Sequence, residues 1–148
     1  PGAAAAFDSA LHSFKATLGT GHPNTLRTLF NRATARQSAE ASPAATREAF
    51  REAHEAIALH YGPQSNLTVL VATRRAGQLA GTGEPEAALK LMTSDALLTG
   101  ARSSHRLNEA DFRTLLQTLC DRLCRSQSSP DDLRAECRRA TDYLNRLP

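Results

Sequence analysis

The residues best suited to chemistry in this chain are five histidines and three cysteines. A zinc protease needs two histidines one helical turn apart beside a glutamate, and phosphate binding needs a glycine-rich loop after a strand. Neither pattern occurs, and there is no nucleophile elbow or paired-carboxylate signature. We therefore predict that the chain is not an enzyme and that it needs no metal and no cofactor. The histidines are His12, His22, His54, His60 and His105.

The three cysteines are Cys120, Cys124 and Cys137. An odd number argues against a disulfide framework, and the spacing lacks the paired C-x-x-C units of structural zinc sites. We therefore expect the cysteines to pack as small apolar side chains between two helices. Unpaired cysteines are typical of a reducing compartment, which predicts a cytoplasmic protein.

Composition favours a helical chain with a modest basic charge. The 148 residues are rich in alanine, leucine and arginine, and only 5% are aromatic. Alanine and leucine favour helices, whereas the β-branched and aromatic runs typical of strands are nearly absent. The net charge of +3 is mild for a nucleic-acid-binding domain. No apolar run approaches the roughly 20 residues of a membrane-spanning helix, so we expect no membrane partner.

A stretch rich in turn-forming residues occurs twice at an offset of 43 residues, as LGTGHPNTL at 18–26 and as YGPQSNLTV at 61–69. Glycine and threonine keep their places in both copies, whereas a third copy has His105 in place of the glycine. Self-similarity at a period of a few tens of residues indicates a repeat architecture. The aligned residues are Gly19 with Gly62, and Thr25 with Thr68.

Apolar residues at spacings of three and four predict an all-α fold of about seven helices. We expect Asn24 or Thr25 to cap the second helix and Asn66 to cap the fourth, because these side chains accept hydrogen bonds from exposed backbone N–H groups. The fifth helix should run unbroken to about Leu98. Prolines suit the first helical turn. Those placed to do so here are Pro43, Pro85 and Pro130.

The repeated linker resembles that of tetratricopeptide repeats of the kinesin-light-chain type, which read L-G-P-D-H-P-D-T-L before a helix ending in N-N-L-A. The repeat here is one residue longer than the family's unit. The resemblance implies a right-handed superhelix, or α-solenoid, of antiparallel helix pairs. The first copy matches at Leu18, Gly19, His22, Pro23, Thr25, Leu26, Asn31 and Ala33. The second matches at Gly62, Pro63, Thr68, Ala76, Gly83, Glu86, Ala88 and Leu89.

By this resemblance, residues 1–148 form a single helical-repeat domain. The expected units are a half repeat at 1–18, two repeats at 19–61 and 62–104, and a degenerate pair at 105–148 that caps the stack. The chain starts in mid-repeat, so we expect further repeats or another domain before it in the parent protein.

In tetratricopeptide folds, the first helix of each pair lines a concave groove. Polar residues opposite the predicted core recur at the 43-residue offset, and one row resembles the row with which the family grips a peptide. Asparagine offers both donor and acceptor to a peptide backbone, and arginine binds carboxylates through two N–H groups. We expect these residues to bind a protein or peptide segment of acidic character. They are Arg27, Asn31, Arg74, Arg75, Arg113 and Gln117.

The sequence therefore predicts a protein–protein interaction module, an adaptor within a larger bacterial regulatory or signalling protein. Two alternatives remain open. The arginines could contact nucleic-acid phosphates, although no aromatic residues alternate with them to stack bases. The first helix could also mediate self-association, because it lies where the predicted stack of repeats is cut.

Overall fold

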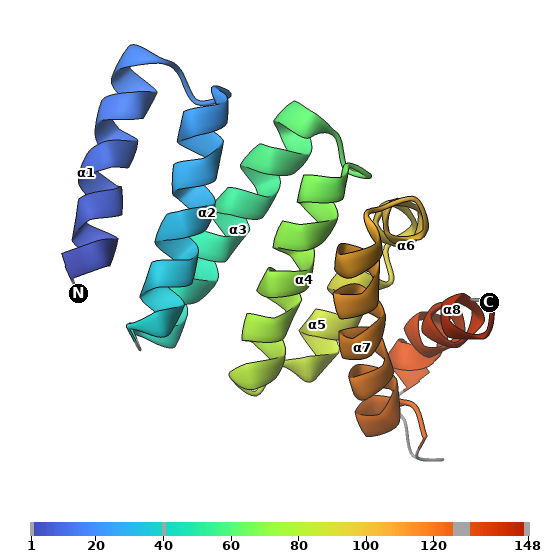
Figure 1. Cartoon of the computed structure of the whole chain (residues 1–148). Coiled ribbons are helices and arrows are strands. Elements are labelled where there is room, and N and C mark those ends of the chain that lie inside the picture. The colour runs from blue at the N-terminus through green and yellow to red at the C-terminus, as the bar shows by residue number, and fades with distance from the viewer. Residues whose placement is uncertain (1, 40, 126–130, 147–148) are drawn as a thin grey trace. The chain divides into compact units, whose positions relative to one another are not determined.

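The computed structural model describes residues 2–39, 41–125 and 131–146. These residues form eight α-helices and one 3-10 helix and contain no strand, which confirms the all-α prediction (Figure 1). The elements are α1 (Gly2–Thr17), α2 (Pro23–Ser38), α3 (Pro43–Tyr61), α4 (Asn66–Gly81), α5 (Pro85–Met92), α6 (Asp95–Arg102), α7 (Arg106–Leu123), η1 (Asp131–Leu133) and α8 (Arg134–Asn145).

The predicted fifth helix is in fact two helices. Helix α5 ends at Met92, and the Ser94 Oγ atom accepts a hydrogen bond from the Leu97 backbone N–H at 3.3 Å, which caps α6. A serine side chain that takes a backbone N–H in this way starts a new helix, because it satisfies a donor that an unbroken helix would bind to a carbonyl. This break accounts for eight helices instead of seven.

Two of the predicted caps are wrong by one or two residues. The His22 Nδ1 atom, not Asn24 or Thr25, caps α2 by accepting the Asn24 N–H at 3.1 Å. Ser65 caps α4 by accepting the Thr68 N–H at 3.1 Å. Asn66, the expected cap, is the first residue of α4.

The proline predictions are confirmed where the structure describes them. Pro43 and Pro85 are the first residues of α3 and α5, where the missing N–H of proline costs no helical hydrogen bond. Pro130, expected at the first turn of the last helix, lies outside the described residues.

The repeated glycines share one backbone conformation. Gly19 and Gly62 have φ of +90° and +99°, values that side chains other than hydrogen rarely allow. His105, which the 43-residue offset aligns with these glycines, has φ of −55° and lies immediately before α7, the place that Ser65 holds before α4. Thr25 and Thr68 are both buried, and Thr25 Oγ1 donates to the Gly19 carbonyl at 2.8 Å. The sequence repeat is therefore a repeat of one helix-to-helix turn.

The chain divides into two compact units, Pro1–Gly62 and Pro63–Pro148. Unit 1 holds α1, α2 and α3, and unit 2 holds α4 to α8. The boundary lies one residue from the border expected between the repeats 19–61 and 62–104.

In unit 1, α2 packs against both α1 and α3 (Figure 1). A network of charged side chains joins the three helices beside their apolar contacts. Arg32 of α2 lies between Asp8 of α1, at 3.4 Å, and Glu52 of α3, at 2.5 Å. Lys15 of α1 also donates to Glu52, at 2.9 Å. The buried apolar residues include Leu11, Leu26, Leu29, Ala33, Phe50 and Ile57.

In unit 2, α4 packs against α5, α6 and α7, and α8 packs against α7 and α5. The approach of α6 to α4 is close, because a Cβ atom on Gly100 would lie 2.9 Å from the Gln64 carbonyl oxygen and 3.0 Å from Val69 Cγ2. The core of this unit includes Val69, Ala72, Ala76, Leu89, Met92, Phe112, Leu116, Ala140 and Tyr143.

Two glycine-to-alanine changes in unit 2 should act in opposite directions. Gly100→Ala should lower the free energy of unfolding by roughly 1–3 kcal/mol, because the new methyl group meets the backbone of Gln64. Gly77→Ala is the matched control, since nothing lies within 4 Å of its Cβ position on α4, and it should stabilise by roughly 0.5–1 kcal/mol. Urea unfolding followed by circular dichroism measures both. Equal effects would contradict the close α4–α6 contact.

The Glu52 network should make unit 1 less stable in acid. Burial alone would raise the Glu52 pKa, but the hydrogen bonds from Lys15 and Arg32 outweigh it and hold the pKa below its ordinary value. The ionised form is therefore stabilised by folding, a contribution present at neutral pH and lost as the pH falls through the folded-state pKa. Glu52→Gln should cost about 1 kcal/mol or less at pH 7, since a third of this side chain is exposed.

The same substitution should cost nothing once the pH is low enough to protonate Glu52 in both the folded and the unfolded chain. Glu55→Gln is the control, because Glu55 pairs with Arg51 on the exposed surface of one helix. Its effect should be about 0.3–0.5 kcal/mol. Chemical unfolding of both variants across pH 3–7 gives the comparison, and a Glu52 deficit that persists in acid would contradict the assignment.

Candidate functional site

Helix α4 leaves one narrow strip of its surface uncovered. Its exposed and half-exposed residues recur at spacings of four and three, while the remaining sides of the helix are mostly buried. Arg74 is exposed on this strip and pairs with none of the residues that the structure describes. The strip consists of Leu70, Arg74, Gly77 and Gly81. Arg74, predicted from the sequence to lie on the open face of this helix, is exposed there.

Helix α7 carries the corresponding strip, but in a different register from the one that the sequence indicated. Helices α2 and α4 begin 43 residues apart, whereas α7 begins only 40 residues after α4. Counted from the helix start, Gln117 takes the place of Gly77, and Arg113 takes that of the buried Thr73. The strip on α7 therefore consists of Ala110, Thr114, Gln117 and Asp121, half-exposed at Ala110 and exposed at the rest. We refer to these two strips together as the polar strip, after its polar members Arg74, Thr114, Gln117 and Asp121.

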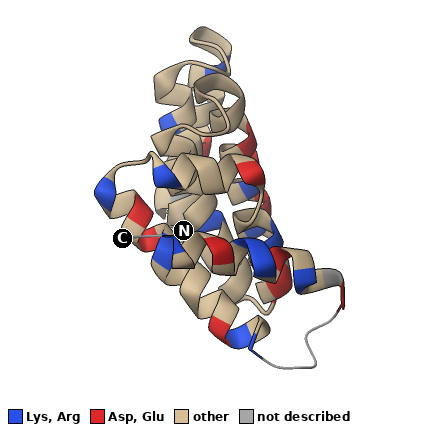
Figure 2. Cartoon of the chain, turned by 90° about the vertical axis from the view of Figure 1, so that its right-hand side faces the viewer, with Lys and Arg blue, Asp and Glu red and all other residues tan. Residues whose placement is uncertain are grey.

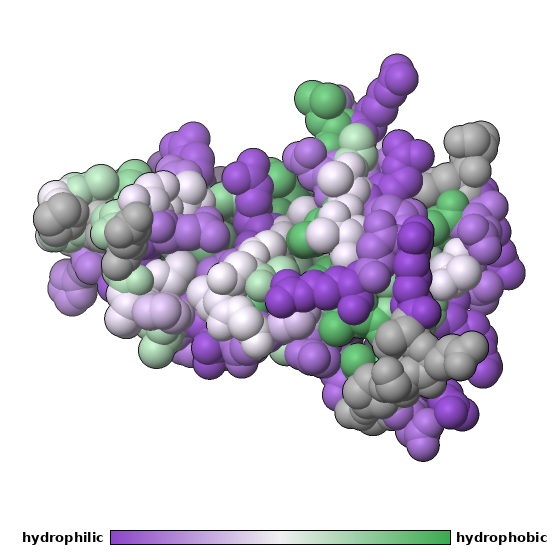
Figure 3. Space-filling model, turned by 90° about the horizontal axis from the view of Figure 1, so that it is seen from below, coloured by the Kyte–Doolittle hydropathy of each residue, from purple (hydrophilic) through white to green (hydrophobic). Residues whose placement is uncertain are grey.

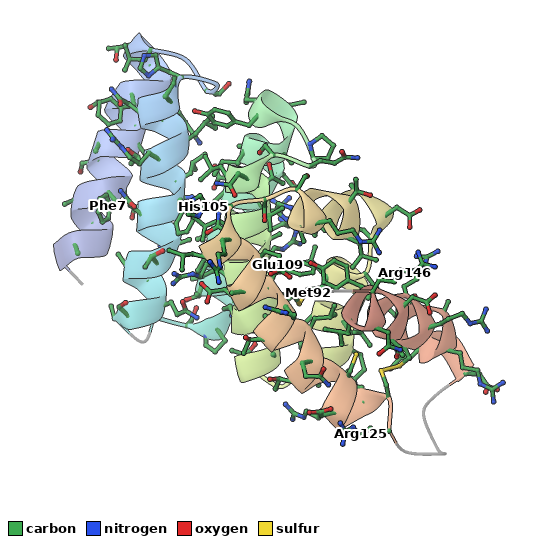
Figure 4. The ribbon with its side chains drawn as sticks, turned by 45° about the vertical axis from the view of Figure 1, so that its right-hand side comes forward. Phe7, Met92, His105, Glu109, Arg125 and Arg146 are labelled. Carbon is green, nitrogen blue, oxygen red and sulfur yellow. A yellow bond between two sulfur atoms is a disulfide. The ribbon has the colours of Figure 1, made fainter. Side chains whose placement is uncertain are left out.

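The two helices that carry the polar strip are tied together at their N-terminal ends. The Asn66 Oδ1 atom accepts hydrogen bonds from the His105 backbone N–H at 2.8 Å and from Asn108 Nδ2 at 2.9 Å. His105, labelled in Figure 4, is the residue immediately before α7. The sequence analysis missed this contact, because asparagine near a helix start also fits a cap. The contact fixes α7 beside α4.

The other predicted binding residues occupy three different settings. Arg27 and Asn31 are exposed on α2 of unit 1, four residues apart and thus on one face, and Arg27 Nη2 donates to Asn24 Oδ1 at 3.1 Å. Arg113 is exposed beside the polar strip and pairs with Glu109 at 3.7 Å. Arg75 is half-buried, and its Nε atom is buried. Arg74 and Gln117 thus lie on two packed helices of the same unit.

Positive charge is distributed among acidic residues and does not form one stripe. Figure 2 shows lysine and arginine interleaved with aspartate and glutamate along the helices. Figure 3 shows apolar residues interrupted by hydrophilic ones on the face that it presents. Among the residues that the structure describes, at least six arginines pair with carboxylates. They are Arg32, Arg36, Arg51, Arg113, Arg125 and Arg134.

The cysteine prediction is wrong, because Cys124 and Cys137 form a disulfide between the C-terminal end of α7 and helix α8 (yellow in Figure 4). An odd number of cysteines leaves one of them unpaired but does not prevent two others from forming a disulfide. Packing of α8 on α7 brings the two Cα atoms to 5.6 Å, within the range that a disulfide spans. The cysteines therefore no longer argue for a reducing compartment.

The remaining cysteine, Cys120, is a buried free thiol one helical turn before Cys124. Burial raises its pKa, and the nearby charge of Asp121 raises it further, so the thiol stays protonated at neutral pH. Among the described residues, no group of three histidine, cysteine, aspartate or glutamate side chains could hold a metal ion. No described helix is both long enough and apolar enough to cross a membrane.

A buried tyrosine also holds α8 in place. The Tyr143 hydroxyl donates to Glu109 Oε1 of α7 at 3.2 Å, and the ring packs edge-on against Phe112 with 5.6 Å between centroids. The Arg102 guanidinium of α6 lies 5.3 Å from the ring centroid. Burial raises the Tyr143 pKa, so the phenol stays neutral and acts as a structural donor.

Reducing the disulfide should destabilise unit 2 selectively. The bridge closes a loop between residues 13 apart in sequence, and the chain-entropy model gives about 3 kcal/mol for a loop of this length. Hydrogen exchange read by mass spectrometry, with and without a reductant, should show faster exchange in α7 and α8. The amides of unit 1 serve as the internal control. A Cys124→Ser, Cys137→Ser variant should behave like the reduced chain, and unchanged exchange in α8 would contradict a stabilising role.

Comparison with known proteins adds no family to this description. No protein-family model matches the chain, and no characterised protein matches it significantly. Its function must be argued from its side chains and their packing.

Proposed function

We propose that this chain is a helical-repeat interaction module of tetratricopeptide type, which binds a segment of another protein and catalyses no reaction. One observation carries the proposal. Helices α4 and α7 are the first helices of successive pairs and pack against each other. Helix α4 leaves one strip exposed and α7 leaves a wider face exposed, so Arg74 and Gln117 lie on exposed faces of the same unit. In tetratricopeptide repeats, whose linker this chain's linker resembles, such strips line the ligand groove.

The side chains on the polar strip favour a peptide ligand with a carboxylate. Arg74 pairs with no described residue and can offer its planar fork to an acidic side chain. Gln117 donates to Asp121 Oδ1 at 2.9 Å, which leaves its amide oxygen to accept from a peptide N–H. Asp121 also pairs with Arg125 at 2.8 Å, so the charge at this end of the strip is balanced. We therefore expect an acidic group of the partner to contact Arg74.

Unit 1 offers a similar pair of side chains. Because α2 and α4 share the 43-residue offset, Arg27 and Asn31 hold the positions on α2 that Leu70 and Arg74 hold on α4. Both are exposed. We propose that they contact the same class of ligand, an extended protein segment.

The alternatives receive less support. Binding of nucleic acid would use the arginines, but six of them already pair with carboxylates within the chain. Self-association through α1 remains a separate hypothesis. The role in a bacterial regulatory or signalling protein rests on the resemblance of the linker alone. The predicted cytoplasmic location rested on unpaired cysteines, and the disulfide removes that argument.

A capture experiment with matched variants tests the binding proposal. The immobilised chain should retain specific proteins from a bacterial lysate at low and moderate salt, and Arg74→Ala, Gln117→Ala should lose them. The control, Arg139→Ala, Gln37→Ala, removes the same two kinds of side chain from exposed positions on α8 and α2 outside the polar strip and should retain them. For a segment identified by mass spectrometry and synthesised, fluorescence anisotropy should show at least about tenfold weaker binding to the first variant, as expected for the loss of a charged hydrogen bond.

The other outcomes contradict the proposal in different ways. Retention of the same proteins by both variants would place the binding site elsewhere on the chain. Capture of nucleic acid alone, released by salt, would identify phosphate binding by the arginines. A mass that increases with concentration, with no partner captured, would favour self-association.

A further inference from the structure

The three cysteines of the chain meet beside one pocket of unit 2. This pocket, of about 210 Å³, lies between the C-terminal turns of α7 and the C-terminal half of α8. Both the free thiol of Cys120 and the bridged Cys124 line it, whereas Cys137 does not. The remaining wall is polar except at Leu144, and includes Gln117, Asp121, Arg125, Thr141 and Asn145.

The pocket exposes one end of the disulfide. An external thiolate opens a disulfide by attacking one sulfur in line with the bond, and access decides which sulfur it attacks. Cys124 and Cys137 are both half-buried, but only Cys124 forms part of the pocket wall, so a thiolate in the pocket meets the Cys124 end of the bridge. Cys137 then becomes the leaving group. The pocket therefore favours attack by an external thiolate on Cys124 over attack on Cys137.

The free cysteine is poorly placed to open the bridge itself. Cys120 is buried, and its raised pKa keeps it a thiol, whereas the nucleophile in exchange is a thiolate. It stands one turn before Cys124 on α7, and a bond between them would require that helix to distort. The bridge to Cys137 is thus protected from internal exchange but open to an external thiol.

We propose that the pocket between α7 and α8 is a thiol-exchange site, where a small external thiol attacks Cys124 and opens the disulfide that holds α8. The thiolate forms a bond to Cys124 Sγ, the bond between Cys124 and Cys137 breaks, and the electron pair leaves on Cys137, which takes a proton from water. A second molecule of thiol attacks the mixed disulfide and releases Cys124. Two thiols are oxidised to one small disulfide, and the protein gains two thiols.

Opening the bridge has a local structural consequence. The bridge attaches the N-terminal part of α8 to α7, whereas Tyr143 and its hydrogen bond to Glu109 hold the C-terminal part. After exchange, the tyrosine keeps α8 docked and the first turns of the helix lose their covalent attachment. This inference is independent of the proposed binding function, because it concerns only the sulfur atoms and the pocket.

The experiment uses the full oxidised chain and 2-mercaptoethanol, whose only charge is that of its thiolate. After short exposure, acid quenching and alkylation with N-ethylmaleimide, peptide mass spectrometry locates the adduct. We expect the mercaptoethanol adduct on Cys124 and the alkyl group on Cys137, with a rate proportional to thiolate concentration. Cys120→Ala should give the same products.

Charge variants test whether the reaction takes place in the pocket. Asn145 is an exposed residue of the pocket wall, so Asn145→Lys should accelerate the reaction about twofold and Asn145→Asp should slow it about as much, the order of effect that one unit charge has across a small pocket in water. The same changes at Leu107, exposed on α7 more than four turns before Cys124 and outside the polar strip, are the control and should have little effect.

Three results would overturn the proposal. The first is an adduct that forms mainly on Cys137, which would mean attack from outside the pocket. The second is a rate independent of thiol concentration, because unfolding of the unit would then limit the reaction. The third is a bridge that resists 2-mercaptoethanol in the folded chain and yields only to a protein dithiol, which would identify a surface for a protein reductant in place of a small-molecule site.

Discussion

Unit 2 depends on covering helix α4, because a helix of this length gains most of its stability from the packing of its apolar sides. Helices α5, α6 and α7 supply that cover. Small side chains make the contacts possible, since Ala72 and Ala76 are fully buried and Gly100 lets α6 reach the start of α4. One strip of α4 remains uncovered. The candidate binding surface is thus the part of α4 that packing leaves open, which explains why it is narrow and why its residues follow helical spacing.

The elements beside this strip are held by specific polar contacts as well as by apolar burial. Asn66 ties the start of α7 to the start of α4, and Tyr143 and the disulfide fix α8 on α7. Side chains on elements fixed in this way lose less conformational freedom on binding than side chains on loops do. Arg74 and Gln117 therefore stand on a rigid support, which is what recognition of an extended peptide requires.

Local signals in the sequence predicted much of the fold, and tertiary contacts account for what they missed. Pro43, Pro85 and the two linker glycines act within a turn, so their positions identified helix ends directly. The exposed face of α7 was predicted in the wrong register, because the 43-residue offset between the starts of α2 and α4 shortens to 40 residues between α4 and α7. The bridge between Cys124 and Cys137 required the packing of two helices, which a count of cysteines cannot supply. The strip on α4 was predictable from the sequence, because it follows from the periodicity of a single helix and not from contacts between helices.

The polar strip and the thiol-exchange pocket share two side chains, Gln117 and Asp121. A partner held by Gln117 would occupy one wall of the pocket and limit the approach of a thiol to Cys124. Loosening of α8 would in turn change the surroundings of Gln117, because Thr141, Leu144 and Asn145 form the opposite wall. Coupling between two equilibria is reciprocal, so a ligand that protects the bridge from reduction must bind more tightly to the bridged chain. Under these two proposals, the covalent state of two cysteines and the affinity of a noncovalent surface are linked through one amide side chain and its carboxylate neighbour.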